Sequence, residues 1–338
     1  MKKFLRWLLI VVAVLIIVYL LGPRPAAPDY KKEMPAVPAQ AAALENYVKE
    51  QESQHKLKPD NEARIVWAND SAKHKTPWAI VYLHGFSASQ AEGDPVHRNL
   101  AKEFGCNLYL SRLSQHGIDT TEPMMNLTAE NYWESAEQAL AIGKQLGDKV
   151  LLVGTSTGGT NALQLAAAYP ADISALVLMS PNIAINNDKA WLLNKPWGKQ
   201  IATWVTGKDH IEPGPTDDTS ALNRQYWCTR YPLNATVALE EMLETSMKKS
   251  TFEKVTQPTL VLYYYKDAIH QDSTVRVDAI LNMYDQLGTP ANLKHKQAMP
   301  NTGSHVLGSY IRSHDVEGVQ REIEKFMKET LGLQPVVK

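Results

Sequence analysis

Short apolar runs alternate with amphipathic stretches along the chain from about residue 62. Apolar runs of this length predict strands, and apolar positions spaced three and four residues apart predict helices. The alternation predicts an α/β fold, with a mostly parallel sheet covered by helices on both faces. The strands are expected at residues 64–67, 78–83, 107–110, 150–153, 174–179 and 259–265, with a weaker one at 292–297. The helices are expected at residues 128–146, 274–287 and 316–331, and a further helix is expected after Ser156, ending at the helix breaker Pro170.

The N-terminal segment has the pattern of a membrane-spanning helix. Lys2, Lys3 and Arg6 precede an apolar run at residues 7–21, which lies at the lower limit of length for a span. Basic residues on its N-terminal side predict that this end faces the cytoplasm and that the main domain is extracytoplasmic, periplasmic in a bacterium. A cleaved signal peptide is the alternative, although no small-x-small site follows the run. Either interpretation exports the main domain.

Three regions are therefore expected along the chain. Residues 1–22 form the anchor, residues 23–40 form a proline-rich spacer, and residues 41–338 form the main domain. Because proline-rich segments are stiff and extended, we expect the spacer to hold the domain off the bilayer. The strand–helix alternation stops between residues 182 and 257, which predicts a helical cap inserted between two core strands.

Composition restricts the classes of partner. The net charge is −1 over 338 residues, which gives no electrostatic reason to expect nucleic acid or an anionic membrane surface as a partner. Cys106 and Cys228 lack metal-site spacing, and we expect buried thiols, with a bridge between them left open. The sequence contains no H-E-x-x-H, C-x-x-C or G-x-x-x-x-G-K motif, so neither a metal nor another cofactor is expected.

A G-x-S-x-G motif joins a predicted strand to a predicted helix. Ser156 lies at its centre, between Gly154 and Gly158. In such a turn the serine backbone is strained and its hydroxyl projects above the sheet. Glycine is needed on both sides because a larger side chain would collide with neighbouring strands. The motif is short, but its place between strand and helix predicts that Ser156 is a nucleophile.

A serine nucleophile needs a histidine to remove its proton and an acid to orient that histidine. In a parallel sheet such groups converge at the carboxyl ends of the strands, in the chain order Ser, acid, His. Asp267 follows the sixth predicted strand and His305 follows the last one. The predicted triad is Ser156, Asp267 and His305. His314 is the rival base and Asp272 is the rival acid.

An anionic tetrahedral intermediate also needs hydrogen-bond donors directed at its oxygen. The amide of Thr157, at the start of the helix, is one candidate donor. The other is expected in the loop after the strand at 78–83, where the amide of Phe86 is best placed. His84 and His116 are expected to support loop structure rather than to catalyse.

These motifs resemble those of the α/β-hydrolase superfamily, and within it the capped branch of monoacylglycerol lipases, carboxylesterases and serine-aminopeptidase-like hydrolases. The resemblance is carried by His84-Gly85-Phe86, residues 154–159, the Asp267 turn and His305, and it covers about residues 61–333. Family members commonly have Met or Leu after the nucleophile, where this chain has Thr157, but only the backbone amide is needed there. The serine nucleophile argues against the dehalogenase and epoxide-hydrolase branches, for which the resemblance implies an aspartate.

The resemblance implies hydrolysis of a small-molecule carboxylic ester, with an apolar acyl group, through an acyl-enzyme on Ser156. Four tryptophans of the predicted cap either wall the pocket for that group or, more simply, pack the cap onto the core. They are Trp191, Trp197, Trp204 and Trp227. Two alternatives stay open: an exopeptidase or amidase that uses the same triad, and a non-catalytic binding protein with the same fold.

Overall fold

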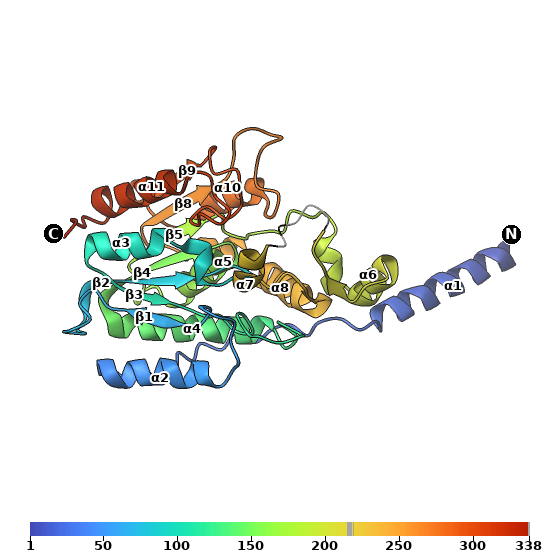
Figure 1. Ribbon diagram of the computed structural model, residues 1–338. Helices are drawn as coiled ribbons and strands as arrows, with labels where there is room; N and C mark the ends of the chain where they lie inside the picture. The colour runs from blue at the N-terminus through green and yellow to red at the C-terminus, as the bar shows by residue number, and fades with distance from the viewer. Residues whose placement is uncertain (215–217, 219, 337–338) are drawn as a thin grey trace.

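The computed structural model describes residues 1–214, 218 and 220–336. Within them, seven strands form one sheet in the order β1-β3-β2-β4-β5-β8-β9 (Figure 1). Neighbouring strands are parallel except for β1 and β3, which are antiparallel. The strands are β1 (Arg64–Val66), β2 (Thr76–Leu83), β3 (Asn107–Leu110), β4 (Gly147–Thr155), β5 (Ala175–Met179), β8 (Thr259–Tyr263) and β9 (Lys294–Ala298).

The predicted α/β fold is confirmed, and helices cover both faces of the sheet. Alternate residues of a strand point to opposite faces, so a sheet buried on both sides needs apolar residues at successive positions. In β2, Ile80 and Tyr82 pack into a cluster with α3 and α11, whereas Ala79 and Val81 pack with α4 and α5. The polar strand β9 lies at the edge, where lysines are common, which explains its weak apolar pattern.

Figure 1 shows α3 and α11 on one side of the sheet and α2 and α4 on the other. The sequence pattern predicted α4, α5, α10 and α11, and it did not single out α3. These core helices are α2 (Ala41–Ser53), α3 (Val96–Phe104), α4 (Ala129–Leu146), α5 (Thr157–Ala168), α10 (Val277–Gln286) and α11 (Val316–Glu329).

The order of the strands places a switch point at the centre of the sheet. After β2 the chain adds β3 on one side, then returns to add β4 on the other side of β2. In such sheets the loops at the carboxyl ends of the two central strands diverge and leave room for a site. The loop after β2 and the turn after β4 are therefore neighbours at one edge of the sheet.

The segment between β5 and β8, residues 182–257, is the region predicted as the cap, and we use that name for it. Its tryptophans differ in exposure. Trp227 is 8% exposed, as expected for packing onto the core, but Trp191 is 50% and Trp204 is 84% exposed. The cap elements are the 3₁₀ helix η2 (Ala190–Asn194), α6 (Gly198–Thr206), β6 (His210–Ile211), α7 (Ala221–Tyr226), β7 (Tyr231–Pro232), α8 (Leu233–Ser246) and α9 (Lys249–Phe252).

The N-terminal helix α1 (Lys2–Leu20) projects away from the body, and among the described residues it is the one helix long and apolar enough to cross a membrane (Figure 1). The segment that follows does not stand clear of the body, contrary to the expectation of a spacer. Tyr30 Oη lies 2.8 Å from Thr245 Oγ1 of α8, and the Trp133 indole donates to the Lys31 carbonyl at 2.8 Å. Side-chain partners on α4 and α8 thus hold these residues against the domain.

Candidate active site

Ser156 occupies a strained turn between β4 and α5. Its φ is 52° and its ψ is −118°, a backbone conformation that non-glycine residues rarely adopt. Its N–H donates to the Met179 carbonyl at 2.9 Å, which ties the turn to the end of β5. A Cβ on Gly158 would lie 1.9 Å from the Leu83 carbonyl oxygen, and one on Gly154 would lie 2.5 Å from the Gly158 oxygen. Gly158 is therefore needed for the turn to fit against β2, and Gly154 is needed for β4 to pass close to the first residues of α5.

His305 pairs with a carboxylate that is fully removed from solvent. Its Nδ1 lies 2.6 Å from Asp272 Oδ2, and the Asp272 side chain is 0% exposed. The other carboxylate oxygen, Oδ1, accepts the N–H groups of Thr274 at 2.8 Å and Val275 at 3.1 Å. These two backbone donors fix the carboxylate, so that Oδ2 is directed at the imidazole.

Burial and the mutual attraction of Asp272 and His305 shift the pKa of each group in opposite directions. Burial alone would raise the pKa of Asp272, but the His305 imidazole and the two backbone N–H groups hold that pKa below its usual value. Burial alone would lower the pKa of His305, but the Asp272 carboxylate raises that pKa above its usual value, with a smaller contribution from Glu92. The carboxylate is therefore ionised at neutral pH and stabilises a positive charge on the imidazole.

The prediction that Asp267 contacts His305 is wrong, because His305 pairs with Asp272. Asp267 lies at the tip of a short loop closed by a bridge between Tyr265 and Gln271, and its carboxylate accepts the N–H of His270 at 2.8 Å. This N–H and the His270 ring lower the pKa of Asp267 to about 2. The loop brings the chain back, so that the Asp272 N–H donates to the Tyr264 carbonyl at 3.1 Å. Asp272, five residues later, thus occupies the position at the end of β8.

The loop that carries His305 packs beside the Ser156 turn. A Cβ on Gly308 would lie 3.4 Å from the Met179 side chain, and the Met179 carbonyl accepts the Ser156 N–H. His305 Nε2 is buried and has no hydrogen-bond partner among the described residues. The rival histidine, His314, is exposed and its ring lies against Gly303. The sequence-predicted serine and histidine therefore lie in adjacent loops, and the carboxylate that pairs with His305 is that of the rival Asp272.

The backbone N–H groups of the two predicted oxyanion donors, Phe86 and Thr157, have no hydrogen-bond acceptor among the described residues. Phe86 follows β2 in the loop beside the turn, and Thr157 is the first residue of α5, where helical N–H groups are free. His84 supports the loop as expected, because its Nε2 accepts the Leu113 N–H at 3.0 Å and its Nδ1 lies 2.9 Å from the Gly85 carbonyl. His116 supports it too, because its Nε2 accepts the Ser87 N–H at 3.0 Å.

A buried carboxyl group, Glu92, was not found from the sequence. Its Oε2 accepts the Gly85 N–H at 2.6 Å, and a Cβ on Gly85 would lie 2.9 Å from both Glu92 Oε1 and Ser156 Cβ. Burial raises the pKa of Glu92 to about 7. Only the tertiary contact identifies this residue, since its position in the short 3₁₀ helix η1 (Gln90–Gly93) has no motif. Glu92 holds in place the loop that presents the Phe86 amide.

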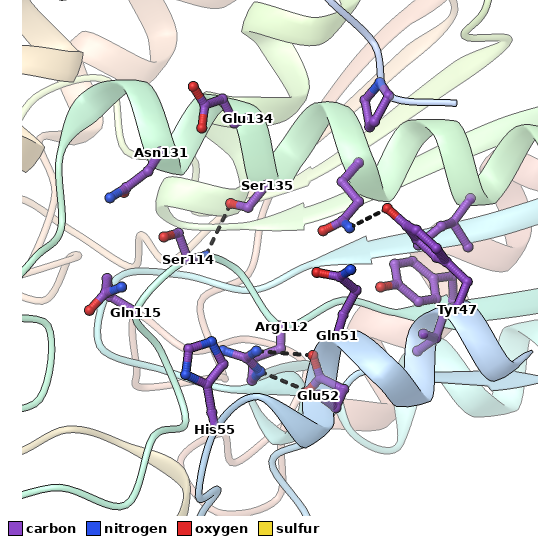
Figure 2. A pocket seen from close by; sticks show the side chains of 15 residues that line it. Tyr47, Gln51, Glu52, His55, Arg112, Ser114, Gln115, Asn131, Glu134 and Ser135 are labelled. Atoms are coloured by element: carbon purple, nitrogen blue, oxygen red, sulfur yellow. Dashed lines mark hydrogen bonds and ion pairs between the residues drawn. The ribbon is translucent and has the colours of Figure 1, made fainter. Parts of the chain in front are cut away.

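A polar cavity of about 330 Å³ lies between α2 and α4 (Figure 2). Arg112 and Glu52 form a two-point ion pair in its wall, with Nε–Oε2 at 2.7 Å and Nη2–Oε1 at 3.0 Å. Arg112 Nη1 also donates to the His116 carbonyl at 3.2 Å. Ser156 and His305 do not line this cavity. The ion pair therefore connects α2 to the histidine that supports the Phe86 loop, and the cavity is separate from the candidate active site.

No group of three or more His, Cys, Asp or Glu side chains that could hold a metal ion occurs among the described residues. Cys106 and Cys228 are both buried and unbridged. The candidate active site itself presents a hydroxyl, an imidazole, a carboxylate and two backbone amides, an arrangement suited to nucleophilic attack on a carbonyl.

Comparisons with known proteins agree with this architecture. The comparison with curated proteins found no match. A structure from work on LipS and LipT, two metagenome-derived lipolytic enzymes, aligns over 81% of this chain and 100% of its own, with 17% identity and a TM-score of 0.63. The monoacylglycerol lipase of Paleococcus ferrophilus aligns over 78% of this chain and 97% of its own, with 13% identity and a TM-score of 0.56. Est1E of Butyrivibrio proteoclasticus, with ferulic acid bound, aligns over 80% and 95%, with 17% identity and a TM-score of 0.55.

At these identities the structural likeness shows the fold alone. The sequence itself carries the stronger finding, because residues 79–336 match the family described as alpha/beta hydrolase fold. That match begins in β2 and includes the serine turn, the cap and the histidine loop. The chain belongs to the α/β-hydrolase-fold family.

Proposed function

We propose that the protein is a membrane-anchored serine hydrolase that cleaves carboxylic esters with an apolar acyl group. Ser156 is the nucleophile, His305 is the general base and acid, and Asp272 orients the imidazole. The observation that carries this proposal is the buried Asp272–His305 hydrogen bond of 2.6 Å in the loops beside the strained Ser156 turn.

The reaction follows from the hydrogen bonds. Asp272 Oδ2 accepts the Nδ1–H of His305, which leaves the Nε2 lone pair free to take the Ser156 proton as the hydroxyl attacks the ester carbonyl. The amides of Phe86 and Thr157 donate to the oxygen that becomes negative. Protonated His305 then gives its proton to the leaving alcohol. Water attacks the acyl-enzyme by the same route and restores the hydroxyl.

Helix α1 anchors the protein as a single membrane span, with the N-terminus in the cytoplasm and the hydrolase domain outside it. Its 19 residues, Lys2–Leu20, contain no acidic residue, and the basic residues lie in its first two turns. Basic residues stay on the cytoplasmic side of a span. Expression with reporter fusions at each end tests this orientation, and mass analysis of the mature chain tests whether the segment is cleaved.

Ser156→Ala tests the catalytic proposal directly. Hydrolysis of a series of p-nitrophenyl acyl esters should fall to the background rate, and labelling by a fluorophosphonate probe should disappear. Ser174→Ala is the matched control, because Ser174 lies just before β5, at the amino ends of the strands, whereas Ser156 lies at their carboxyl ends. Undiminished turnover by Ser156→Ala would disprove the assignment. Absence of any adduct on the folded wild-type chain would favour a non-catalytic binding protein.

The same preparation separates ester from amide hydrolysis. Esters and aminoacyl amides of equal acyl size would be compared at one enzyme concentration. A larger kcat/KM for the esters is expected, because the two carboxyl groups described beside Ser156 already have partners: Asp272 pairs with His305, and Glu92 accepts the Gly85 N–H. A preference for the aminoacyl amides would identify an exopeptidase or amidase that uses the same three residues.

A further inference from the structure

Large apolar side chains are exposed on one part of the cap, next to α1. Ile201, Trp204 and Val205 lie three and four residues apart on α6 and so share one face of that helix. Trp191 and Leu192 of η2 are exposed beside them. We call these five residues the cap face. Exposed apolar clusters of this kind usually mark a surface that another apolar phase or partner covers.

The cap face is continuous with the membrane helix. Four of its residues line a largely apolar cavity of about 600 Å³, and Tyr19 of α1 lines the same cavity. Trp197, which caps the N-terminus of α6, donates its indole N–H to the Val18 carbonyl at 2.9 Å, and its backbone N–H donates to the Pro23 carbonyl at 2.9 Å. Figure 1 shows α6 beside the inner end of α1. The cap therefore contacts α1 within its last turn.

The length of α1 sets the depth of that contact. A helix of 19 residues spans about 28 Å at roughly 1.5 Å per residue, whereas the hydrocarbon core of a bilayer is about 30 Å thick. The whole helix is therefore needed to cross, and its last turn lies at the hydrocarbon boundary. Because Trp197 contacts Val18 in that turn, the cap face beside it lies at the same depth.

We infer that the cap face is inserted into the outer leaflet of the bilayer and that the apolar cavity opens to the lipid phase. This inference rests on the proposed span by α1. Trp204 and Trp191 then lie at the level that tryptophan prefers in membranes, and Lys189, an exposed residue that also lines the cavity, is placed to reach lipid phosphates. The substrate class that follows is an ester whose acyl chain resides in the bilayer.

The contacts of residues 30 and 31 with the domain support the same inference. A free spacer would allow the domain to move away from the membrane, but Tyr30 and the Lys31 carbonyl are held by α8 and α4. Only residues 21–29 join α1 to this fixed point, and Pro23 among them is bound by the cap. The domain is therefore held close to the bilayer surface with the cap face toward it.

A fluorescent probe at the cap face tests the insertion. The full-length chain, reconstituted in phosphatidylcholine nanodiscs, would carry an NBD label on Trp204→Cys or, in a second variant, on Val205→Cys. Cys106 and Cys228 are buried, so the unsubstituted chain gives the background labelling. The matched control is Val336→Cys, an exposed apolar residue near the C-terminus at the other end of the molecule (Figure 1). Leu15→Cys reports on α1.

Lipids with a doxyl group near the top of the acyl chain should quench the probe at position 204 or 205 at least threefold more than the probe at 336. Quenching at 204 and 205 equal to that at 336, with quenching at position 15 intact, would overturn the inference but leave the anchor proposal standing. Loss of quenching at position 15 as well would overturn both. Labelled dimers in cross-linking, without lipid quenching at 204, would show that a second copy covers the cap face instead.

Activity gives an independent readout. The double variant Ile201→Asp/Trp204→Asp should hydrolyse a bilayer-resident long-chain ester about tenfold more slowly, while its rate with soluble p-nitrophenyl acetate stays within twofold of wild type. Val336→Asp should change neither rate. An equal loss with both substrates would indicate damage to the site, and no loss with either would contradict the inference.

Discussion

The choice between Asp272 and Asp267 yields the sharpest test of the candidate site. Asp272→Asn keeps the shape of the side chain but replaces one oxygen by an NH₂ group. Because the N–H groups of Thr274 and Val275 require an acceptor, the Asn oxygen faces them and its NH₂ faces His305. The imidazole must then present an unprotonated Nδ1, which places the proton on Nε2, the atom that has to receive the Ser156 proton.

The size of the effect follows from what is lost at His305. The charge-assisted bond of 2.6 Å between Nδ1 and Asp272 contributes about 1.5–3 kcal/mol, and forcing the productive tautomer leaves a buried donor unpaired at about 1–3 kcal/mol. A loss of about 4 kcal/mol corresponds to roughly a thousandfold in kcat/KM. The equivalent substitution in a Ser-His-Asp protease lowers kcat by about 10⁴. Asp267→Asn should stay within about twofold of wild type, because among the described residues the Asp267 carboxylate bonds within its own exposed loop, to Ile269 and His270.

The assay is p-nitrophenyl butyrate hydrolysis by the purified full-length chain, with circular dichroism to verify folding of both variants. The pH profile gives a second readout. The Asp272 carboxylate raises the pKa of His305 against the effect of burial, and the base must be neutral, so the acid limb of the wild-type profile reports this raised pKa. That limb should move to lower pH in Asp272→Asn. A larger loss in Asp267→Asn than in Asp272→Asn would refute the assignment of the acid.

Two further predictions concern stability. Glu92→Gln should raise the free energy of unfolding by about 3 kcal/mol near pH 8 and change it little near pH 4, because burial raises the pKa of Glu92 from 4.5 to about 7. As the pH rises from 4.5 to about 7, the carboxyl group loses its proton in the unfolded chain before it does so in the folded one, so the wild-type free energy of unfolding falls over this range. A difference between the two proteins in urea denaturation that is the same at both pH values would contradict this prediction. Gly158→Ala should prevent accumulation of folded protein, at a cost above about 4 kcal/mol, since its Cβ would lie 1.9 Å from the Leu83 oxygen. Gly207→Ala, in open space but at φ +67°, should cost only about 1–2 kcal/mol, and equal solubility of these two variants would disprove the steric argument.

The local pattern of apolar and polar residues was sufficient to predict the core strands of the fold and some residues of the candidate site. The strands that lie between two helical layers are apolar at successive positions, so they were visible without tertiary information, as were the glycines flanking Ser156. The position of His305 followed from the rule that functional groups gather at the carboxyl ends of parallel strands. These features depend on residues close together in the chain or on the general geometry of parallel sheets.

Tertiary contacts decided the rest, because they depend on how a loop returns to the sheet and on which elements meet. The bridge between Tyr265 and Gln271 closes a loop that turns Asp267 outward and brings Asp272 to His305, and no spacing rule distinguishes these two acids. Likewise the tryptophan count of the cap gave no sign that Trp227 would be buried and that Trp204, on α6, would be exposed. Whether a side chain is exposed depends on which elements pack against it in the folded chain, and the residues next to it in the sequence do not determine that.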